Sequence, residues 1–408
     1  DYNASSYGIA YEYDHSGNVT RMTYIPASLV LQNETVNGVI SYSAADSIIA
    51  GPAYTVASGA SVLLQAGKKV ILKPGFTAVQ GSYFNAKIDP FLTTDATVVT
   101  YSYDALGRLI SVGTPSDADF YAAYTYHADS RLYSEALANG TETRLHFYNS
   151  PGWLLRIDGD RLIEDITHTT GWSGPGYYDG RIKTTSFTYN WAGKPADYAV
   201  QYTYDNLGQL TSADNNSNNA WDIGIGNTIS YDANGNILDL TRGSSTKTYA
   251  YYTGTNKVQN IDGSGNDYGY DPNANVISSS PKSINTITYD SFTQRPASVS
   301  MSSGASLTLE YGGDTQRILK NYNNGTSTNS KLYLHGENDY PLIEKNKTST
   351  TAETLAVYIY GLNGTVAKRV GSTVLFLLKD HLGSTRVVMD ATGLVRTYYD
   401  YDALGNII

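Results

Sequence analysis

The sequence predicts an all-β protein in which antiparallel hairpins stack into a spiralling sheet or barrel-like shell, with a small solenoid-like β insertion. A tyrosine-rich pattern, Y-x-Y-D-x-x-G, recurs along most of the chain, and no segment has the apolar periodicity of a helix. The 408 residues include 37 Tyr and 38 Gly but only 8 Phe and 4 Trp, so Tyr must supply most of the packing. A chain of this length is long enough for several units or one repeat array.

The full pattern occurs four times, and a fifth copy begins with Ile229 in place of the first Tyr. A copy at 268–274 ends in Ala274 instead of Gly, and Tyr289 and Tyr360 mark partial copies. From Tyr231 the second tyrosines follow at short and similar intervals, at Tyr252, Tyr270, Tyr289 and Tyr311. The second Tyr, the Asp and the Gly of the five copies are Tyr13, Asp14, Gly17; Tyr103, Asp104, Gly107; Tyr204, Asp205, Gly208; Tyr231, Asp232, Gly235; and Tyr401, Asp402, Gly405.

Each position of the pattern has a physical role. Two Tyr at i and i+2 face the same side of a sheet, where cross-strand aromatic pairs contribute about 0.2–1 kcal/mol each. The Asp side chain can accept backbone N–H groups two residues on, and the Gly supplies the positive φ of a tight turn. About twenty residues therefore make two strands and two turns. Because one hairpin buries little surface, we expect successive hairpins to pair edge to edge.

One run resembles a known family, the RHS/YD-repeat proteins. It reads Lys379-Asp380-His381-Leu382-Gly383-Ser384-Thr385-Arg386 and is similar to the signature near the C-terminal end of the RHS core, which assigns Asp380, Gly383 and Arg386 to a turn. The resemblance covers residues 1–24 and about 101–408. It implies a β-ribbon wound into a hollow shell, and members include bacterial toxin carriers and large cell-surface proteins.

Residues 25–100 interrupt the repeat between a first hairpin, 1–24, and the main array, 101–408. Short apolar strands alternate with Gly-containing turns in this segment, which resembles the coathanger stacks of secreted bacterial proteins. It would serve either as a spacer or contact surface or as a mere insertion.

Signatures of catalysis are few. The sequence lacks a GxSxG elbow, an HExxH pair and a phosphate-binding loop, and the nearest approach to an elbow, Gly171-Trp172-Ser173-Gly174-Pro175, ends in Pro. Its six His are scattered, and for His381 we expect a hydrogen bond within its own hairpin. Asp400 and Asp402 could face the same way, but Asp402 is a turn residue. The sequence therefore predicts no enzyme and no cofactor.

One segment has a weak resemblance to a calcium loop. Oxygen-bearing side chains alternate at Asp214, Asn216, Asn218 and Asp222, but the Gly and the terminal Glu of such loops are missing. A solvated Asn-rich turn is the stronger interpretation, so no metal site is assigned.

The composition limits the partners. A net charge of −10 without a Lys/Arg cluster excludes a nucleic-acid partner, and no apolar stretch is long enough to span a membrane. The absence of Cys excludes disulfides and thiolate chemistry. Since Asp1 is not preceded by a leader, we expect a mature chain or a fragment, extracellular or on a bacterial cell surface.

Both ends of the sequence cut a repeat, so we expect unpaired strand edges there. The hypothesis that follows is a structural protein whose copies join end to end into an extracellular fibre, a homo-oligomer formed through its terminal strands. Two alternatives remain. The chain could be a shell fragment of an RHS toxin carrier, or a glycan-binding adhesin with rows of aromatic side chains that include Trp153, Trp172, Trp191 and Trp221.

Overall fold

The computed structural model describes residues 5–6, 9–14, 16–24, 28–44, 47–66, 69–88, 97–114, 119–171, 173–216, 219–226, 228–313, 315–335, 340–348 and 354–408. The chain forms two compact units. The first contains Asp1–Ala123, Leu334–Ile343 and Leu355–Val374, and the second contains Tyr124–Tyr333, Glu344–Thr354 and Leu375–Ile408.

The prediction of an all-β fold is confirmed. Over the described residues the strands are joined by turns and by one short 3-10 helix, η2 (Asn219–Trp221), and no α-helix occurs. No helix that could span a membrane is found in that part of the chain.

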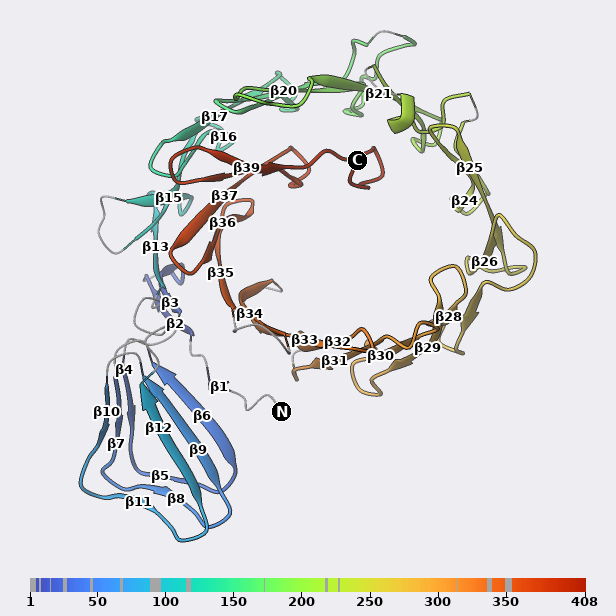
Figure 1. Ribbon diagram of the computed structural model, residues 1–408. Helices are drawn as coiled ribbons and strands as arrows, with labels where there is room; N and C mark the ends of the chain where they lie inside the picture. The colour runs from blue at the N-terminus through green and yellow to red at the C-terminus, as the bar shows by residue number, and fades with distance from the viewer. Residues whose placement is uncertain are drawn as a thin grey trace. The chain divides into compact units, whose positions relative to one another are not determined.

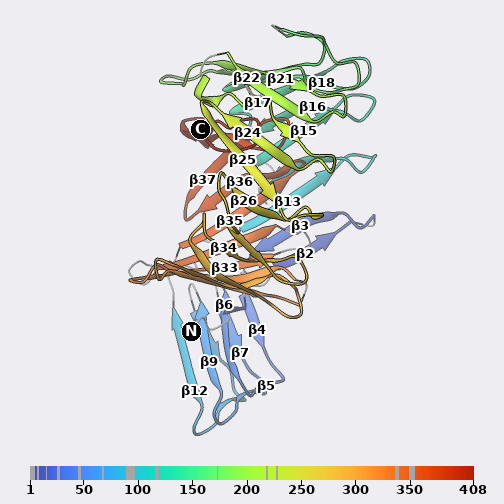
Figure 2. The same ribbon diagram turned by 90° about the vertical axis from the view of Figure 1, so that its right-hand side faces the viewer.

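The first unit contains a parallel solenoid between two repeat strands. Three coils of three strands each stack in register, so that Lys69 lies opposite Ser47 and Tyr83 opposite Ser61. Buried side chains such as Ile48, Tyr54 and Leu64 fill its interior. Figures 1 and 2 show its walls, made of β4 (Ser28–Leu31), β7 (Ser47–Ala50) and β10 (Lys69–Leu72); β5 (Glu34–Val36), β8 (Tyr54–Val56) and β11 (Phe76–Ala78); and β6 (Val39–Ala44), β9 (Ser61–Ala66) and β12 (Tyr83–Ile88).

Antiparallel strands make up most of the rest of the first unit. β1 (Ser5–Ser6) pairs in parallel with β6 of the solenoid, whereas β2 (Ile9–Tyr13), β3 (Val19–Tyr24), β13 (Thr97–Tyr103) and β14 (Leu109–Gly113) pair antiparallel in that order. The pairing of β3 with β13 brings Tyr24 opposite Thr97, on either side of the solenoid. β35 (Thr354–Gly361) and β36 (Gly364–Val370) form a further hairpin.

The second unit is a succession of hairpins in which strands next to each other in sequence pair, except between β22 and β23 and between β26 and β27, where one sheet ends and the next begins. β15 (Phe120–Tyr126) enters it from the first unit, and β34 (Pro341–Thr348) divides between the two. Its strands up to η2 are β16 (Leu132–Leu137), β17 (Glu142–Tyr148), β18 (Leu154–Gly159), β19 (Leu162–Thr167), β20 (Thr184–Tyr189), β21 (Tyr198–Tyr204) and β22 (Leu210–Asn215). After η2 follow β23 (Ser230–Tyr231), β24 (Ile237–Arg242), β25 (Ser245–Tyr251), β26 (Val258–Ile261), β27 (Tyr268–Tyr270), β28 (Val276–Ser279), β29 (Ile284–Tyr289), β30 (Pro296–Met301), β31 (Ser306–Tyr311), β32 (Arg317–Asn323) and β33 (Thr328–His335).

The last strands of the second unit return to its beginning. These are β37 (Thr373–Lys379), β38 (Thr385–Asp390) and β39 (Val395–Tyr398). Figure 1 draws them in red near the teal strands β16 and β17, and hydrogen bonds from Arg144 of β17 to Lys379 and from His381 to Glu164 of β19 join segments far apart in the sequence. The end of the chain is therefore fixed on strands that come much earlier in the sequence.

Candidate functional site

The repeat turns share one hydrogen-bond pattern, which the copy at Asp104 illustrates. Its Oδ1 accepts the backbone N–H groups of Leu106 at 2.9 Å and Arg108 at 3.0 Å, and its Oδ2 accepts Arg108 Nε at 2.7 Å. Gly107 follows with φ at 76°. The carboxylate therefore holds the whole turn closed, and the same i+2 and i+4 pattern recurs at Asp14, Asp205, Asp232, Asp380 and Asp402.

The second Tyr of a repeat ties its hairpin to an earlier part of the sheet. Tyr103 donates its hydroxyl to the backbone carbonyl of Val19 at 3.0 Å, and a β-bulge just before Tyr103 turns the side chain toward that strand. The same bond to a carbonyl on an earlier strand or loop is made by Tyr204, Tyr231, Tyr251, Tyr270, Tyr289, Tyr311, Tyr360 and Tyr401. These hydroxyls satisfy the partner that a half-buried Tyr requires.

The structure corrects the assignment of one repeat. Tyr251, not Tyr252, donates to Ile237, and the bulge lies between Ala250 and Tyr251. Tyr252 occupies the position that Asp has elsewhere, since its N–H bonds to the carbonyl of Lys257 at the base of the turn. In the copy that lacks Gly, Ala274 adopts φ of 69° in the left-handed region.

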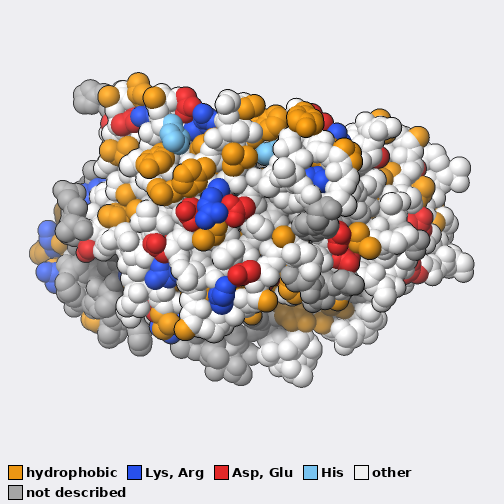
Figure 3. All heavy atoms as spheres, turned by 90° about the horizontal axis from the view of Figure 1, so that it is seen from above, with side chains coloured by type: hydrophobic (Ala, Val, Ile, Leu, Met, Phe, Trp, Pro, Cys, Tyr) orange, Lys and Arg blue, Asp and Glu red, His pale blue; other side chains and the backbone are white. Residues whose placement is uncertain are grey.

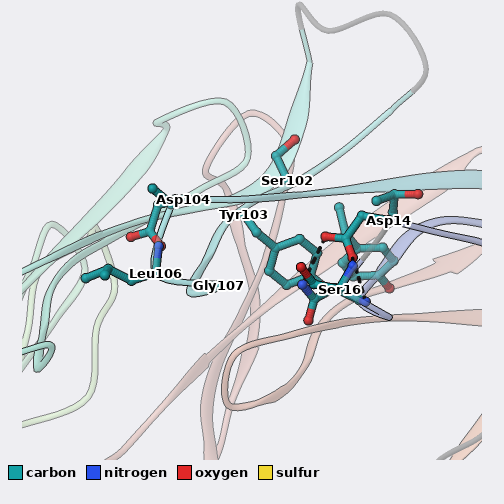
Figure 4. Close-up of a pocket in the computed structure, with 11 residues that line it drawn as sticks. Asp14, Ser16, Ser102, Tyr103, Asp104, Leu106 and Gly107 are labelled. Carbon is teal, nitrogen blue, oxygen red and sulfur yellow. Dashed lines mark hydrogen bonds between the residues drawn. The ribbon is translucent and has the colours of Figure 1, made fainter.

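A cavity of about 840 Å³ lies between the first two full repeats of the first unit (Figure 4). Asp14 and Asp104 both contribute to its lining, yet each carboxylate is already engaged by its own turn. These hydrogen bonds, from Asn18 to Asp14 and from Arg108 to Asp104, lower the pKa of both carboxyl groups. Both carboxylates are thus ionised and stabilise their own turns, and neither is suited to hold a proton for acid catalysis.

Two residues of the run that resembles the RHS core signature, Asp380 and Arg386, belong to a buried cluster in the second unit. Arg386 is 6% exposed and donates to Asp380 Oδ2 at 2.8 Å and to the hydroxyl of Tyr198 at 2.8 Å. Asp400, 4% exposed, accepts hydroxyls from Tyr189 and Tyr198 and lies 3.6 Å from Arg386. Burial raises the pKa of both tyrosines, so these hydroxyls remain protonated donors. We call these five residues the signature cluster.

The guanidinium of Arg386 also lies between aromatic rings. It stands 4.1 Å from the centre of the Phe187 ring and 4.9 Å from that of Tyr401. Such stacking stabilises a cation that has left water. The signature cluster thus joins β20 and β21 to the hairpin β37–β38 and to the residues after β39 by ionic, hydrogen-bonding and cation–π contacts.

Four further contacts bind the end of the chain to the earlier strands. Glu164 on β19 is fully buried and accepts both the backbone N–H of His381 and its Nδ1, at 2.9 and 2.6 Å. The expected hydrogen bond of His381 within its own hairpin is therefore wrong, because a buried carboxylate faces the ring. The other three contacts run from Arg161 to the carbonyl of Gly393, from Arg144 to that of Lys379 and from Arg242 to Asp402.

Two buried bases in this region lack a hydrogen-bond partner among the described residues. His146 Nε2 is one, and burial together with Arg144 lowers the pKa of this ring to about 4, which keeps it neutral. Lys183 Nζ is the other, and burial lowers its pKa as well. It lies over the ring of Tyr177 at 5.3 Å, close to the exposed Gly174.

In the segment that resembles a calcium loop, two side-chain oxygens accept hydrogen bonds from backbone N–H groups. Asn216 Oδ1 accepts the N–H of Ala199 and Asp222 Oδ1 that of Asn215, both at 2.8 Å. Asn218 lies outside the described residues, and Asp214 makes interactions of its own. Over the described residues no group of three His, Asp or Glu is arranged to hold a metal ion.

The remaining predicted side chains are dispersed. Ser173 bonds to Gln201 in an exposed loop, and Trp172 beside it is outside the described residues. Trp153 packs on His168 and Trp221 on Tyr198, so these two do not form an aromatic row. Asp400 accepts a hydrogen bond from the Tyr198 hydroxyl, whereas Asp402 accepts one from Arg242.

The C-terminal copy closes more fully than its sequence suggested. Ile407 bridges back to Tyr401, and the N–H of Ile408 bonds to the carbonyl of Asp400. The contacts of this copy are internal to it or made by side chains, so the expected unpaired strand edge stays a prediction.

Sequence reasoning missed the earlier residues that contact Arg386, Asp400 and His381. Tyr189, Tyr198, Glu164 and Phe187 come much earlier in the chain than the run that they hold. Their only local signal is a strand in which polar or charged residues occupy inward positions, as at Glu164 of β19. That signal does not specify a partner.

Known proteins resemble this chain in two ways. A family model described as Teneurin YD-shell matches residues 177–408, which is more than half of the chain and includes the signature cluster. Salivary gland surface protein 1 of Aedes aegypti is 31% identical over 152 residues, which amount to 34% of this chain and 4% of that protein.

Solved structures share the fold. The crystal structure of TcdB2-TccC3 superposes with a TM-score of 0.61 at 15% identity, over 76% of this chain and 17% of that one. The TcdB2-TccC3-Cdc42 structure gives 0.50 at 13% identity, over 77% and 18%. This chain therefore spans only a small part of the length of these proteins.

Proposed function

Since the chain belongs to the Teneurin YD-shell family, we propose that its repeat array is a shell that encloses and protects a polypeptide, as part of a larger extracellular protein. The role is structural, and no catalytic step is assigned to the described residues. The fold shared with TcdB2-TccC3 and the resemblance to RHS toxin carriers both favour a shell over a fibre.

The signature cluster is the observation that carries the proposal. The last strands of a shell that retains a polypeptide must stay attached to the strands they contact. Solvent-exposed ion pairs would contribute little free energy to that attachment. Arg386, Asp380 and Asp400 are each less than a tenth exposed, and they join segments that are far apart in the sequence. A buried pair that is broken costs several kcal/mol, so this contact resists local opening.

The fibre hypothesis lacks comparable support. Neither the matching family model nor the shared fold points to a protein that joins end to end. Extracellular placement is part of the proposal and is supported by the match to the Teneurin YD-shell family.

Particle imaging tests the assembly. Negative-stain micrographs of the purified chain should contain discrete hollow particles of one size. Long filaments would instead support the fibre and overturn the shell.

A protected reporter tests enclosure itself. An unstructured peptide tag fused after Ile408 should survive a protease that digests the same tag inserted beside Gly325, in an exposed turn of the second unit. Equal digestion of both tags would overturn the proposal that the array encloses what is attached to its end.

A further inference from the structure

A second cavity lies within the second unit, beside the turn of Asp390. It has a volume of about 460 Å³ and is formed by the turn after β20, at Trp191, Ala192 and Gly193, and by residues 393–398 of the β38–β39 turn and β39. This volume falls in the range of small-molecule sites. Three consecutive residues of β39 are exposed at this place, Arg396, Thr397 and Tyr398.

Aromatic rings form the apolar part of the cavity. Trp191 and Tyr398 have ring centres 6.2 Å apart with planes at 50°, and Tyr398 is 45% exposed. Behind them lies Tyr189, 5.3 Å from Trp191 and 6.4 Å from Tyr398. Because the Tyr189 hydroxyl donates a hydrogen bond to Asp400, the signature cluster holds the Tyr189 ring in place against Trp191 and Tyr398.

Arg396 supplies the polar part of the cavity. Its Nε and Nη2 bond to Asp390 Oδ2 at 3.0 and 2.6 Å, and its Nη1 has no hydrogen-bond partner among the described residues. The Thr392 hydroxyl, which donates to Asp390, and Arg396 lower the pKa of the Asp390 carboxyl group to about 2. The guanidinium is therefore presented in one orientation, with two donors already used.

The turn that carries these residues is rigid. Gly393 has φ of 84°, and a Cβ at this position would overlap the guanidinium of Arg161. That guanidinium donates to the carbonyl of Gly393 at 2.7 Å. The cavity is therefore largely formed before any ligand arrives, which lowers the ordering cost of binding.

We propose that this cavity binds a neutral pyranose unit of a glycan. The C–H face of a pyranose stacks on exposed Trp and Tyr rings, and the Nη1 of Arg396 can donate to a ring hydroxyl. A carboxylated or sulfated sugar is disfavoured, because Asp390 neutralises Arg396 and the chain carries a net charge of −10.

On the face drawn in Figure 3, Lys and Arg side chains stand beside Asp and Glu side chains. The inference is independent of the shell, since it requires only the turn after β20 and strand β39.

Tryptophan fluorescence and isothermal titration test the site on the intact chain. The probes are cellohexaose, mannohexaose and chitohexaose, with polygalacturonate as the charged comparison. At least one neutral hexasaccharide should bind with a Kd below about 5 mM and change the emission of Trp191. Replacing Trp191→Ala should weaken binding about tenfold or more, and Arg396→Gln about three- to tenfold.

Matched controls separate binding from folding. Trp221→Ala removes a Trp that packs on Tyr198, and Arg295→Gln removes an Arg near the ring of Tyr311; both lie outside the cavity and should leave affinity unchanged. Thermal unfolding midpoints show whether each variant is folded. The proposal is overturned if no neutral hexasaccharide binds, if only polygalacturonate binds, or if folded Trp191→Ala and Arg396→Gln variants bind as the wild type does.

Discussion

Two Arg–Asp pairs with the same sequence spacing allow the signature cluster to be tested against an internal reference. Arg386 bonds to Asp380 with side chains 8% and 1% exposed, whereas Arg396 bonds to Asp390 with side chains 54% and 13% exposed. Each Asp is the turn residue of its hairpin. The pairs therefore differ in burial, and Arg386 also contacts Tyr198 and Asp400.

Arg386→Leu should lower the free energy of unfolding by about 3–5 kcal/mol. The change leaves Asp380 and Asp400 in a buried site without their cation, and breaking a buried ion pair by removing one partner has this cost. It also removes the stacking of the guanidinium on Phe187 and Tyr401. Arg396→Leu should change stability little, because an exposed pair contributes little.

Urea denaturation followed by tryptophan fluorescence measures both variants, since a change of midpoint at constant slope reports stability. Arg386→Lys should give an intermediate loss, because it keeps the charge but not the two separate donors that Arg386 directs at Asp380 and Tyr198. Equal losses for Arg386→Leu and Arg396→Leu would refute the reasoning, since burial would then make no difference.

Three further predictions concern single positions. Ala274→Gly should stabilise the chain by about 1 kcal/mol, because a residue with φ of 69° prefers Gly, while Gly235→Ala should have the opposite effect; thermal unfolding measures both. Tyr270→Phe removes the hydrogen bond to Val258 and should cost about 0.5–1.5 kcal/mol in urea denaturation, whereas Tyr178→Phe, at an 83% exposed ring, should cost nothing measurable. The folded-state pKa of His146 is lowered from 6.5 to about 4, so its contribution to stability is present above pH 6.5 and is lost as the pH falls toward 4; His146→Phe should flatten the stability curve in that window.

The repeat turns were accessible to sequence reasoning because every interaction in them is local. The Asp carboxylate accepts hydrogen bonds from N–H groups two and four residues on, so the spacing of Asp and Gly is enough to predict the conformation of the turn. The tyrosine bonds were less accessible. The acceptor of Tyr204, at Ile182, is more distant in sequence than that of Tyr270, at Val258, because loop lengths differ.

The signature cluster could be located in the sequence only in part. Asp380 and Arg386 belong to a recognisable run, but Tyr189 and Tyr198 become their neighbours only after many hairpins have stacked. The error at Tyr252 has a simpler cause: two consecutive Tyr leave the phase of the repeat ambiguous, and the bulge at Tyr251 decides it. The cavity at Trp191 has no local signal, since its two sides come from distant parts of the sequence.

The pairing of β3 with β13 has a consequence for how such chains diversify. Tyr24 and Thr97 face each other across one ladder, so the solenoid occupies the place of an ordinary hairpin loop. A domain whose two ends lie close together can enter a gene at such a position without changing the register of the strands on either side. The hairpin turns of the repeat array are therefore sites at which a domain can be inserted. Exchanging residues 28–88 for a short turn should leave the remaining hairpins folded.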